Sequence, residues 1–125
     1  MVLFLISNYS GFNTGRGGHY YSLRQMAETI AKNRQVVTIV MGDSVSLPAA
    51  LLGMQNVHSI STKLHKQQKG VKNVIAKLEE LECLSELTTV HAYDAKSAYI
   101  GAHIAKMTKT SFILTKCGGR VPKKF

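Results

Sequence analysis

The feature that most constrains the fold of this chain is an alternation of short apolar runs with longer segments that carry apolar residues every three or four positions. Continuous apolar runs are typical of strands covered on both faces, as in parallel sheets, whereas the three- and four-residue spacing forms one stripe along a helix. The pattern predicts strands at residues 2–7, 36–41, 57–60, 88–92 and 111–115.

Helical stripes fill the segments between these strands. The stripe of residues 17–34 consists of Tyr20, Leu23, Ala27, Ile30 and Ala31. The stripe of residues 69–84 consists of Val71, Val74, Ile75, Leu78 and Leu81. A short helix is expected within residues 48–54. Because both long stripes are one-sided, each helix is expected to pack on the sheet.

The last predicted helix begins after Asp94, which is expected to cap its N-terminus, and Lys106 and Lys109 suit its C-terminal dipole. Small residues on this helix should allow a close approach to the sheet: Ala98, Ala102 and Ala105. Larger apolar residues should fill the interface: Ile100, Ile104 and Met107.

Strands that alternate with helices predict an α/β fold with right-handed crossovers. We expect a three-layer Rossmann-like domain over residues 1–125, with a parallel five-stranded sheet of order 3-2-1-4-5. After the fifth strand the sequence continues into residues 116–125 with no further helical pattern. We therefore expect a fragment that lacks its C-terminal elements, with a sheet edge that is open to a symmetric dimer.

Composition excludes several classes of protein. The chain has no apolar run of the roughly 18 to 20 residues that a membrane-spanning helix needs, and its first apolar run is too short for a signal peptide. Cys83 and Cys117 have no metal-ligand spacing and are expected to be reduced cytoplasmic thiols. The net charge of +9 favours anionic partners, but nucleic-acid binding is not expected because the sequence has no motif for it.

In open α/β sheets, ligands bind at the carboxyl ends of the strands where the strand order reverses, here between the first and fourth strands. The loop after the first strand ends in Gly15, Arg16, Gly17 and Gly18, and His19 follows in the first helical turn. Bare backbone N–H groups at a helix start and a guanidinium suit a phosphate or a sugar hydroxyl. The dinucleotide fingerprint is only half present, because Tyr20 stands where its third glycine would fall, and these glycines can also serve a turn alone.

The fourth strand ends in a second group of polar residues. His91 and Tyr93 are two positions apart, so both side chains should lie on the same face and near the glycine-rich loop, with Asp94 next in the chain. A lone histidine at a strand end can equally be a hydrogen-bonded packing residue. The sequence contains no hydrolase elbow, Walker loop or metal-ligand motif, so the catalytic residues stay unassigned and no metal is expected.

In their order and spacing, these features resemble the N-terminal domain of glycosyltransferase family 4, which has the GT-B architecture. The matching segments are Gly17-Gly18 at the helix start, residues 37–40, the run from Val90 to Asp94, and residues 112–115 leading into Gly118-Gly119. The resemblance covers nearly the whole chain. Tyr93 stands where many members carry a second histidine.

The resemblance implies the acceptor-side half of a retaining, metal-independent hexosyltransferase. It implies that Gly17 and Gly18 lie against the donor diphosphate or the transferred sugar, with a nucleotide-sugar as substrate, no cofactor, and a glycan or lipid-linked acceptor. The paired-glutamate motif and the nucleotide pocket belong to a C-terminal domain, so this chain alone is expected to be inactive. A cytoplasmic enzyme peripheral to the inner face of the membrane is implied.

Two other functions remain open from the sequence. The main alternative is a non-catalytic Rossmann-type nucleotide-binding or interaction domain. The other is a dinucleotide-dependent oxidoreductase, which Tyr20 disfavours.

Overall fold

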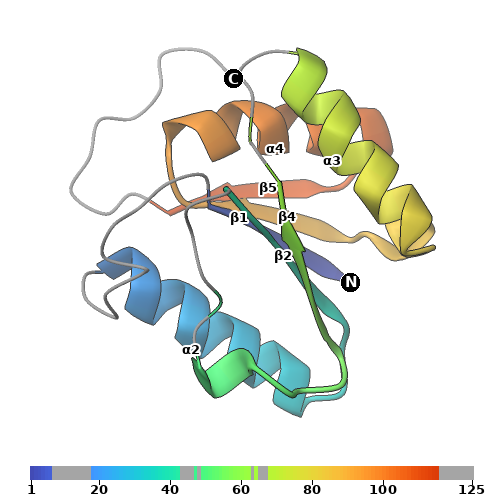
Figure 1. Ribbon diagram of the computed structural model, residues 1–125. Coiled ribbons are helices and arrows are strands. Elements are labelled where there is room, and N and C mark those ends of the chain that lie inside the picture. Colours follow the sequence, from blue (N-terminus) through green and yellow to red (C-terminus); the bar gives the residue numbers. More distant parts are fainter. Residues whose placement is uncertain (7–17, 43–46, 48, 63, 65–67, 116–125) are drawn as a thin grey trace.

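The sheet has the predicted parallel topology. The computed structural model describes residues 1–6, 18–42, 47, 49–62, 64 and 68–115, with residues 18–21 described by their backbone. Its strands are β1 (Val2–Ile6), β2 (Val37–Met41), β3 (Val57–Ser61), β4 (Thr89–Ala92) and β5 (Ser111–Leu114). They form one five-stranded sheet of order β3-β2-β1-β4-β5, in which every neighbouring pair is parallel (Figure 1). The α/β, Rossmann-like fold class is thereby confirmed.

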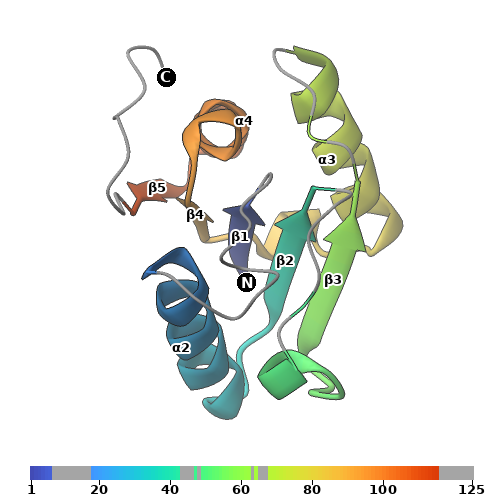
Figure 2. The ribbon, with the colours of Figure 1, turned by 60° about the vertical axis from the view of Figure 1, so that its left-hand side comes forward.

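Helices cover both faces of the sheet and make three layers. The helical elements are α2 (Gly18–Lys32), α3 (Gln68–Glu80), α4 (Ala95–Thr108) and the short 3₁₀ turns η1 (Ala49–Leu51) and η2 (Leu84–Glu86). Figures 1 and 2 show α2 and η1 on one face and α3 and α4 on the other. Each face accordingly has its own apolar core, one beneath α2 and one beneath α3 and α4.

Burial follows the position of each strand in the sheet. All five residues of β2 are buried, and Leu3, Phe4, Leu5 and Ile6 of β1 are each 0% exposed. In the two edge strands, β3 and β5, exposed and less exposed residues are mixed. An edge strand has a neighbouring strand on one side only, so fewer side chains cover it.

Helix α3 ends at Glu80, four residues before the predicted end. Glu82 adopts a left-handed backbone conformation with a φ of 54°, and the amide of Cys83 donates to the carbonyl of Leu78 at 3.2 Å. These two features close the helix in the way that is usual for a left-handed terminal residue. Leu81 therefore lies outside the helix and is 44% exposed, so its assignment to the buried stripe was wrong.

Helix α4 has the predicted cap but a different point of closest approach to the sheet. Asp94 and Ser97 form a reciprocal capping box. A Cβ on Gly101 would lie 2.9 Å from Phe112, 3.0 Å from Leu5 and 3.1 Å from Val90, so the helix lies closest to the sheet at this glycine. Ala98 and Ala105 are buried as expected, whereas Met107 is 63% exposed and does not fill the interface.

Among the described residues, no helix is both long enough and apolar enough to cross a membrane.

Gly101→Ala should destabilise the protein, although alanine is the better helix former. The added methyl group would lie within 3.1 Å of Phe112, Leu5 and Val90, and the last two are fully buried. Overpacking of this kind costs about 1–3 kcal/mol, against a gain of about 1 kcal/mol in helix propensity. We expect a net loss of about 1 kcal/mol in the free energy of unfolding, measured with urea.

The matched control is the same substitution in a Phe112→Leu background, where the closest of the three contacts is gone. The penalty of Gly101→Ala should shrink there. An increase in stability from Gly101→Ala alone would contradict the close approach of α4 to the sheet.

Candidate functional site

The candidate site lies at the carboxyl ends of β1 and β4, where the strand order reverses. The two strands are neighbours, with Phe4 opposite His91 and Leu5 opposite Ala92. Helix α2 begins at this same end of the sheet, beside the ends of β4 and β5 (Figures 1 and 2). Gly18 is the first residue of α2, and His19 lies in its first turn. Gly15, Arg16 and Gly17 lie outside the described residues, so their part in the site stays a prediction.

Two aromatic side chains from the end of β4 are stacked against each other. The rings of His91 and Tyr93 are 4.6 Å apart and nearly parallel, at 6°. Both also pack on the ring of Phe4, with centroid distances of 5.4 Å for His91 and 6.2 Å for Tyr93. The prediction that His91 and Tyr93 lie on the same face is confirmed, and that face is the one covered by α2.

Hydrogen bonds join this ring pair to the elements on either side. The hydroxyl of Tyr93 lies 3.3 Å from that of Ser22 on α2 and 3.6 Å from the sulfur of Met26. On the other side, Nε2 of His91 is hydrogen-bonded to the hydroxyl of Thr115, just beyond β5. The site therefore spans α2, β4 and the end of β5.

Ser22 and Thr115 were not among the site residues predicted from the sequence. The available signal for Thr115 was a polar residue at the carboxyl end of the strand predicted to lie beside β4. Ser22 had a weaker signal, a small polar residue one turn after the glycine-rich start of the helix.

His91 is an uncharged member of the site. Its side chain is only 3% exposed, and burial lowers its pKa from 6.5 to about 4. A neutral imidazole has one nitrogen that donates and one that accepts a hydrogen bond. His91 can therefore bind a hydroxyl or an oxygen atom, but it supplies no positive charge to hold a phosphate near neutral pH.

Asp94 has a structural role at the start of α4. Its Oδ1 accepts hydrogen bonds from the amide of Ser97 at 3.0 Å and from the hydroxyl of Ser97 at 2.8 Å. The same hydroxyl lies 3.0 Å from the amide of Asp94. This cap closes the start of α4 just after Tyr93, and the contact between Asp94 and a ligand stays a prediction.

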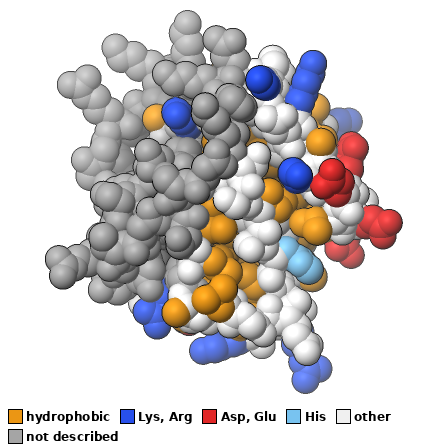
Figure 3. Space-filling view, viewed as in Figure 1, with side chains coloured by type: hydrophobic (Ala, Val, Ile, Leu, Met, Phe, Trp, Pro, Cys, Tyr) orange, Lys and Arg blue, Asp and Glu red, His pale blue; other side chains and the backbone are white. Residues whose placement is uncertain are grey.

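Acidic side chains gather away from the candidate site. Of the seven acidic residues in the chain, four lie close together in the sequence: Glu79, Glu80, Glu82 and Glu86. Figure 3 shows acidic side chains clustered beside the C-terminal end of α3, which leads into the start of β4 and so lies at the opposite end of the sheet. Their repulsion toward an anionic ligand is consequently weak at the carboxyl ends, because it is screened over that distance.

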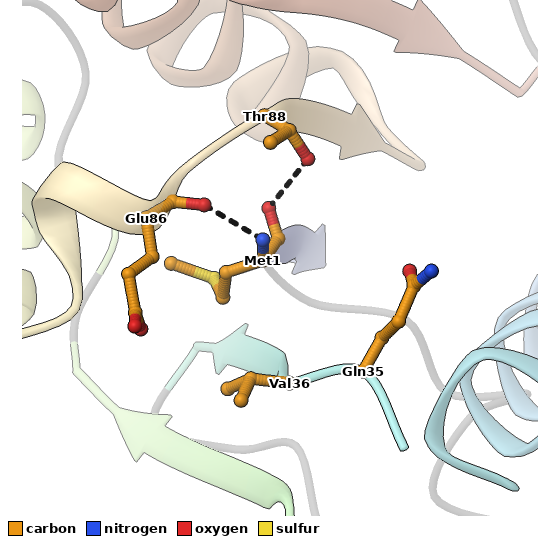
Figure 4. A pocket seen from close by; sticks show the side chains of 5 residues that line it. All are labelled: Met1, Gln35, Val36, Glu86 and Thr88. Carbon is orange, nitrogen blue, oxygen red and sulfur yellow. Dashed lines mark hydrogen bonds between the residues drawn. The ribbon is translucent and has the colours of Figure 1, made fainter. Parts of the chain in front are cut away.

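Two surface hollows have described lining residues. One, of about 340 Å³, is lined by Gln25, Met26, Thr29 and Ile30 on α2, and it adjoins the site because Met26 contacts Tyr93. The other, of about 350 Å³, lies at the amino ends of the strands and is lined by Met1, Gln35, Val36, Glu86 and Thr88 (Figure 4).

Two hydrogen bonds to backbone carbonyls lie in the second hollow. The amino group of Met1 donates to the carbonyl of Glu86 at 2.7 Å, and the hydroxyl of Thr88 donates to the carbonyl of Met1 at 3.1 Å, as drawn in Figure 4. These bonds join the starts of β1 and β4. The hollow thus lies at the end of the sheet away from the ring pair.

Within the described ranges, no group of three or more His, Cys, Asp or Glu side chains is placed to hold a metal ion. Cys83 is a free, buried cysteine, and burial raises the pKa of its thiol.

Comparisons of this chain with protein-family models, curated proteins and solved structures gave no significant match.

The buried imidazole should make the stability of the protein depend on pH. The pKa of His91 is about 4 in the folded protein, whereas an unperturbed histidine, as in the unfolded chain, has a pKa of 6.5. Between these pH values the unfolded chain therefore binds more protons than the folded protein. The contribution of His91 to the free energy of unfolding is therefore fully present above pH 6.5. It is lost as the pH falls toward 4, which lowers the free energy of unfolding by up to roughly 3 kcal/mol. We expect urea unfolding at a series of pH values to show this decline.

His91→Phe is the control, because it keeps a ring against Tyr93 and removes the titrating group. The decline between pH 6.5 and 4 should be smaller in this variant by the contribution of His91. An identical decline in both proteins would show that other groups cause it.

Proposed function

We propose that this chain is the acceptor-side domain of a GT-B glycosyltransferase that transfers a sugar from a nucleotide-sugar to a glycan or lipid-linked acceptor. The observation that carries the proposal is the joining of a neutral imidazole and three hydroxyl side chains at the strand-order reversal of a 3-2-1-4-5 parallel sheet. Ligands of such sheets bind at this position. Neutral donors and acceptors suit the hydroxyl groups of a sugar.

The geometry favours edge contacts over stacking on a sugar ring. His91 and Tyr93 stack on each other and are 3% and 1% exposed, so neither presents an open ring face. A ligand would then meet the hydroxyl of Tyr93 or a nitrogen of His91. Directional hydrogen bonds of this kind distinguish one sugar hydroxyl pattern from another.

In this proposal, binding of the nucleotide-sugar and the transfer step require a second domain. Among the described site residues, His91 is neutral and the carboxylate of Asp94 is held in a capping box. Transfer also requires donor and acceptor in near-attack geometry, which one wall of a cleft does not supply. We therefore expect the complete reading frame to continue into a second Rossmann-like domain that holds the nucleotide-sugar, in a cytoplasmic enzyme peripheral to the membrane.

The same observation supports one alternative. A neutral histidine and a capped aspartate also fit a non-catalytic Rossmann-type domain that binds a nucleotide or a partner protein. Such a domain would bind its ligand without any sugar transfer. The following experiment measures transfer and so distinguishes the two functions.

Gly17→Val in the complete enzyme should reduce transfer at least about tenfold, equivalent to roughly 1.4 kcal/mol of transition-state stabilisation. A side chain immediately before α2 would occupy the space of an approaching phosphate or sugar. Donor consumption and acceptor elongation are measured side by side for the 125-residue chain, the complete enzyme and the variant. The 125-residue chain should show no transfer.

Gly17→Ala serves as a graded control, since its smaller side chain should reduce transfer less, and circular dichroism checks that both variants fold. Transfer by the 125-residue chain alone would refute the half-enzyme proposal. Full activity of Gly17→Val would show that the glycine-rich loop is only a turn.

A further inference from the structure

Thr115 occupies a position set by the backbone. Ala92 is opposite Leu114 in the parallel pair of β4 and β5, and the amide of Thr115 donates to the carbonyl of Ala92 at 3.0 Å. The hydrogen-bond ladder therefore continues one step beyond β5. By alternation from Ile113, which is opposite His91, the side chain of Thr115 lies on the same face as the imidazole.

The imidazole of His91 is held from three directions. Tyr93 stacks on one face at 4.6 Å, the ring of Phe4 lies at 5.4 Å, and the hydroxyl of Thr115 bonds to Nε2. The two aromatic contacts restrain the plane of the ring without distinguishing between its nitrogens. Only the contact with Thr115 does so.

The hydrogen bond at Nε2 also bears on the tautomer. Among the described residues, Nε2 with Thr115 is the one hydrogen bond made by the His91 side chain, and His91 is the one partner of the Thr115 hydroxyl. The hydroxyl of Thr115 can either donate its proton to Nε2 or accept a proton from Nε2. In the first arrangement, the proton of the neutral ring resides on Nδ1.

We propose that Thr115 is a positioning residue of this site, whose hydroxyl holds His91 in the Nδ1–H tautomer and so makes Nδ1 a hydrogen-bond donor toward an oxygen atom of the ligand. The ligand class that fits is an oxygen-rich, polyhydroxylated molecule such as a sugar. This assignment to a sugar rests on the proposed function, whereas the role of Thr115 toward His91 does not.

The first test is the tautomer itself, measured by ¹⁵N NMR of the histidine side chains of the 125-residue chain at neutral pH. The wild-type protein should show His91 with a protonated Nδ1 and an unprotonated Nε2. This measurement uses the wild-type protein, so it does not depend on whether a variant folds. A protonated Nε2 in the wild-type protein would overturn the proposal.

Three variants then separate the hydroxyl of Thr115 from its shape. Thr115→Val keeps the shape and removes the hydroxyl, so His91 should become a mixture of both tautomers. Thr115→Ser keeps the hydroxyl and should retain the single tautomer. Ser22→Ala removes the partner of Tyr93 on the other side of the ring pair and should leave the His91 tautomer unchanged. A single tautomer in Thr115→Val, or a mixture in Thr115→Ser, would contradict the role of Thr115.

The second test measures transfer kinetics in the complete enzyme. Only the Nδ1–H fraction of the tautomer mixture can donate to the ligand. KM for the acceptor should therefore rise in Thr115→Val, about fivefold where about one fifth of His91 keeps this tautomer, with kcat little changed, and Thr115→Ser should restore KM to within about twofold. Unchanged KM in Thr115→Val would show that Nδ1 does not contact the ligand. Absence of transfer in every protein, with the tautomer as predicted, would refute the proposed function and leave the positioning role intact.

Discussion

The structure depends on the burial of residues 3–6 of β1 at the centre of the sheet. From Leu3 to Ile6 the side chains point alternately into the core beneath α3 and α4 and into the core beneath α2, and none of the four is exposed. A strand buried on both faces must have helices on both sides, because its apolar surface would otherwise meet water. The three layers follow from this requirement, as does the pairing of β1 with β2 on one side and β4 on the other.

The pairing of β1 with β4 also builds the candidate site. Since Phe4 is opposite His91, the ring pair of His91 and Tyr93 rests on a side chain of the central strand. The same burial lowers the pKa of His91 and keeps its imidazole neutral. The fold therefore determines the chemical character of the site, which is that of neutral hydrogen-bonding groups held by packing.

Sequence periodicity predicted the strands and the common face of His91 and Tyr93, because these features depend on local alternation. The strand order followed from the usual topology of doubly wound parallel sheets. The ends of helices were less predictable. Glu82 terminates α3 with a positive φ where glycine is the usual residue, so the sequence contains no clear stop signal. Gly101 was missed as the closest approach of α4 because that distance depends on β1, β4 and β5 together.

The partners of the ring pair could not be predicted from the sequence for a related reason. Ser22 and Tyr93 are 71 residues apart, and His91 and Thr115 are 24 residues apart. Each contact requires the correct strand order and also the correct rotation or register of a neighbouring element. Local sequence patterns constrain the strand order far more than they constrain the rotation or register of a neighbouring element. The sequence therefore predicted where the site lies better than which side chains complete it.

The central claim of the proposal is that a sugar, either of the acceptor or of the nucleotide-sugar, binds at the carboxyl ends of β1 and β4. The most direct measurement is an NMR titration of this chain with a panel of glycan acceptors and nucleoside-diphosphate sugars, following backbone amides at both ends of the sheet. We predict the largest shifts at Ser22, Tyr93 and Thr115, with little change at Gln35 and Thr88 in the hollow at the amino ends. Shifts confined to Gln35 and Thr88, or no shifts with any member of the panel, would contradict the account.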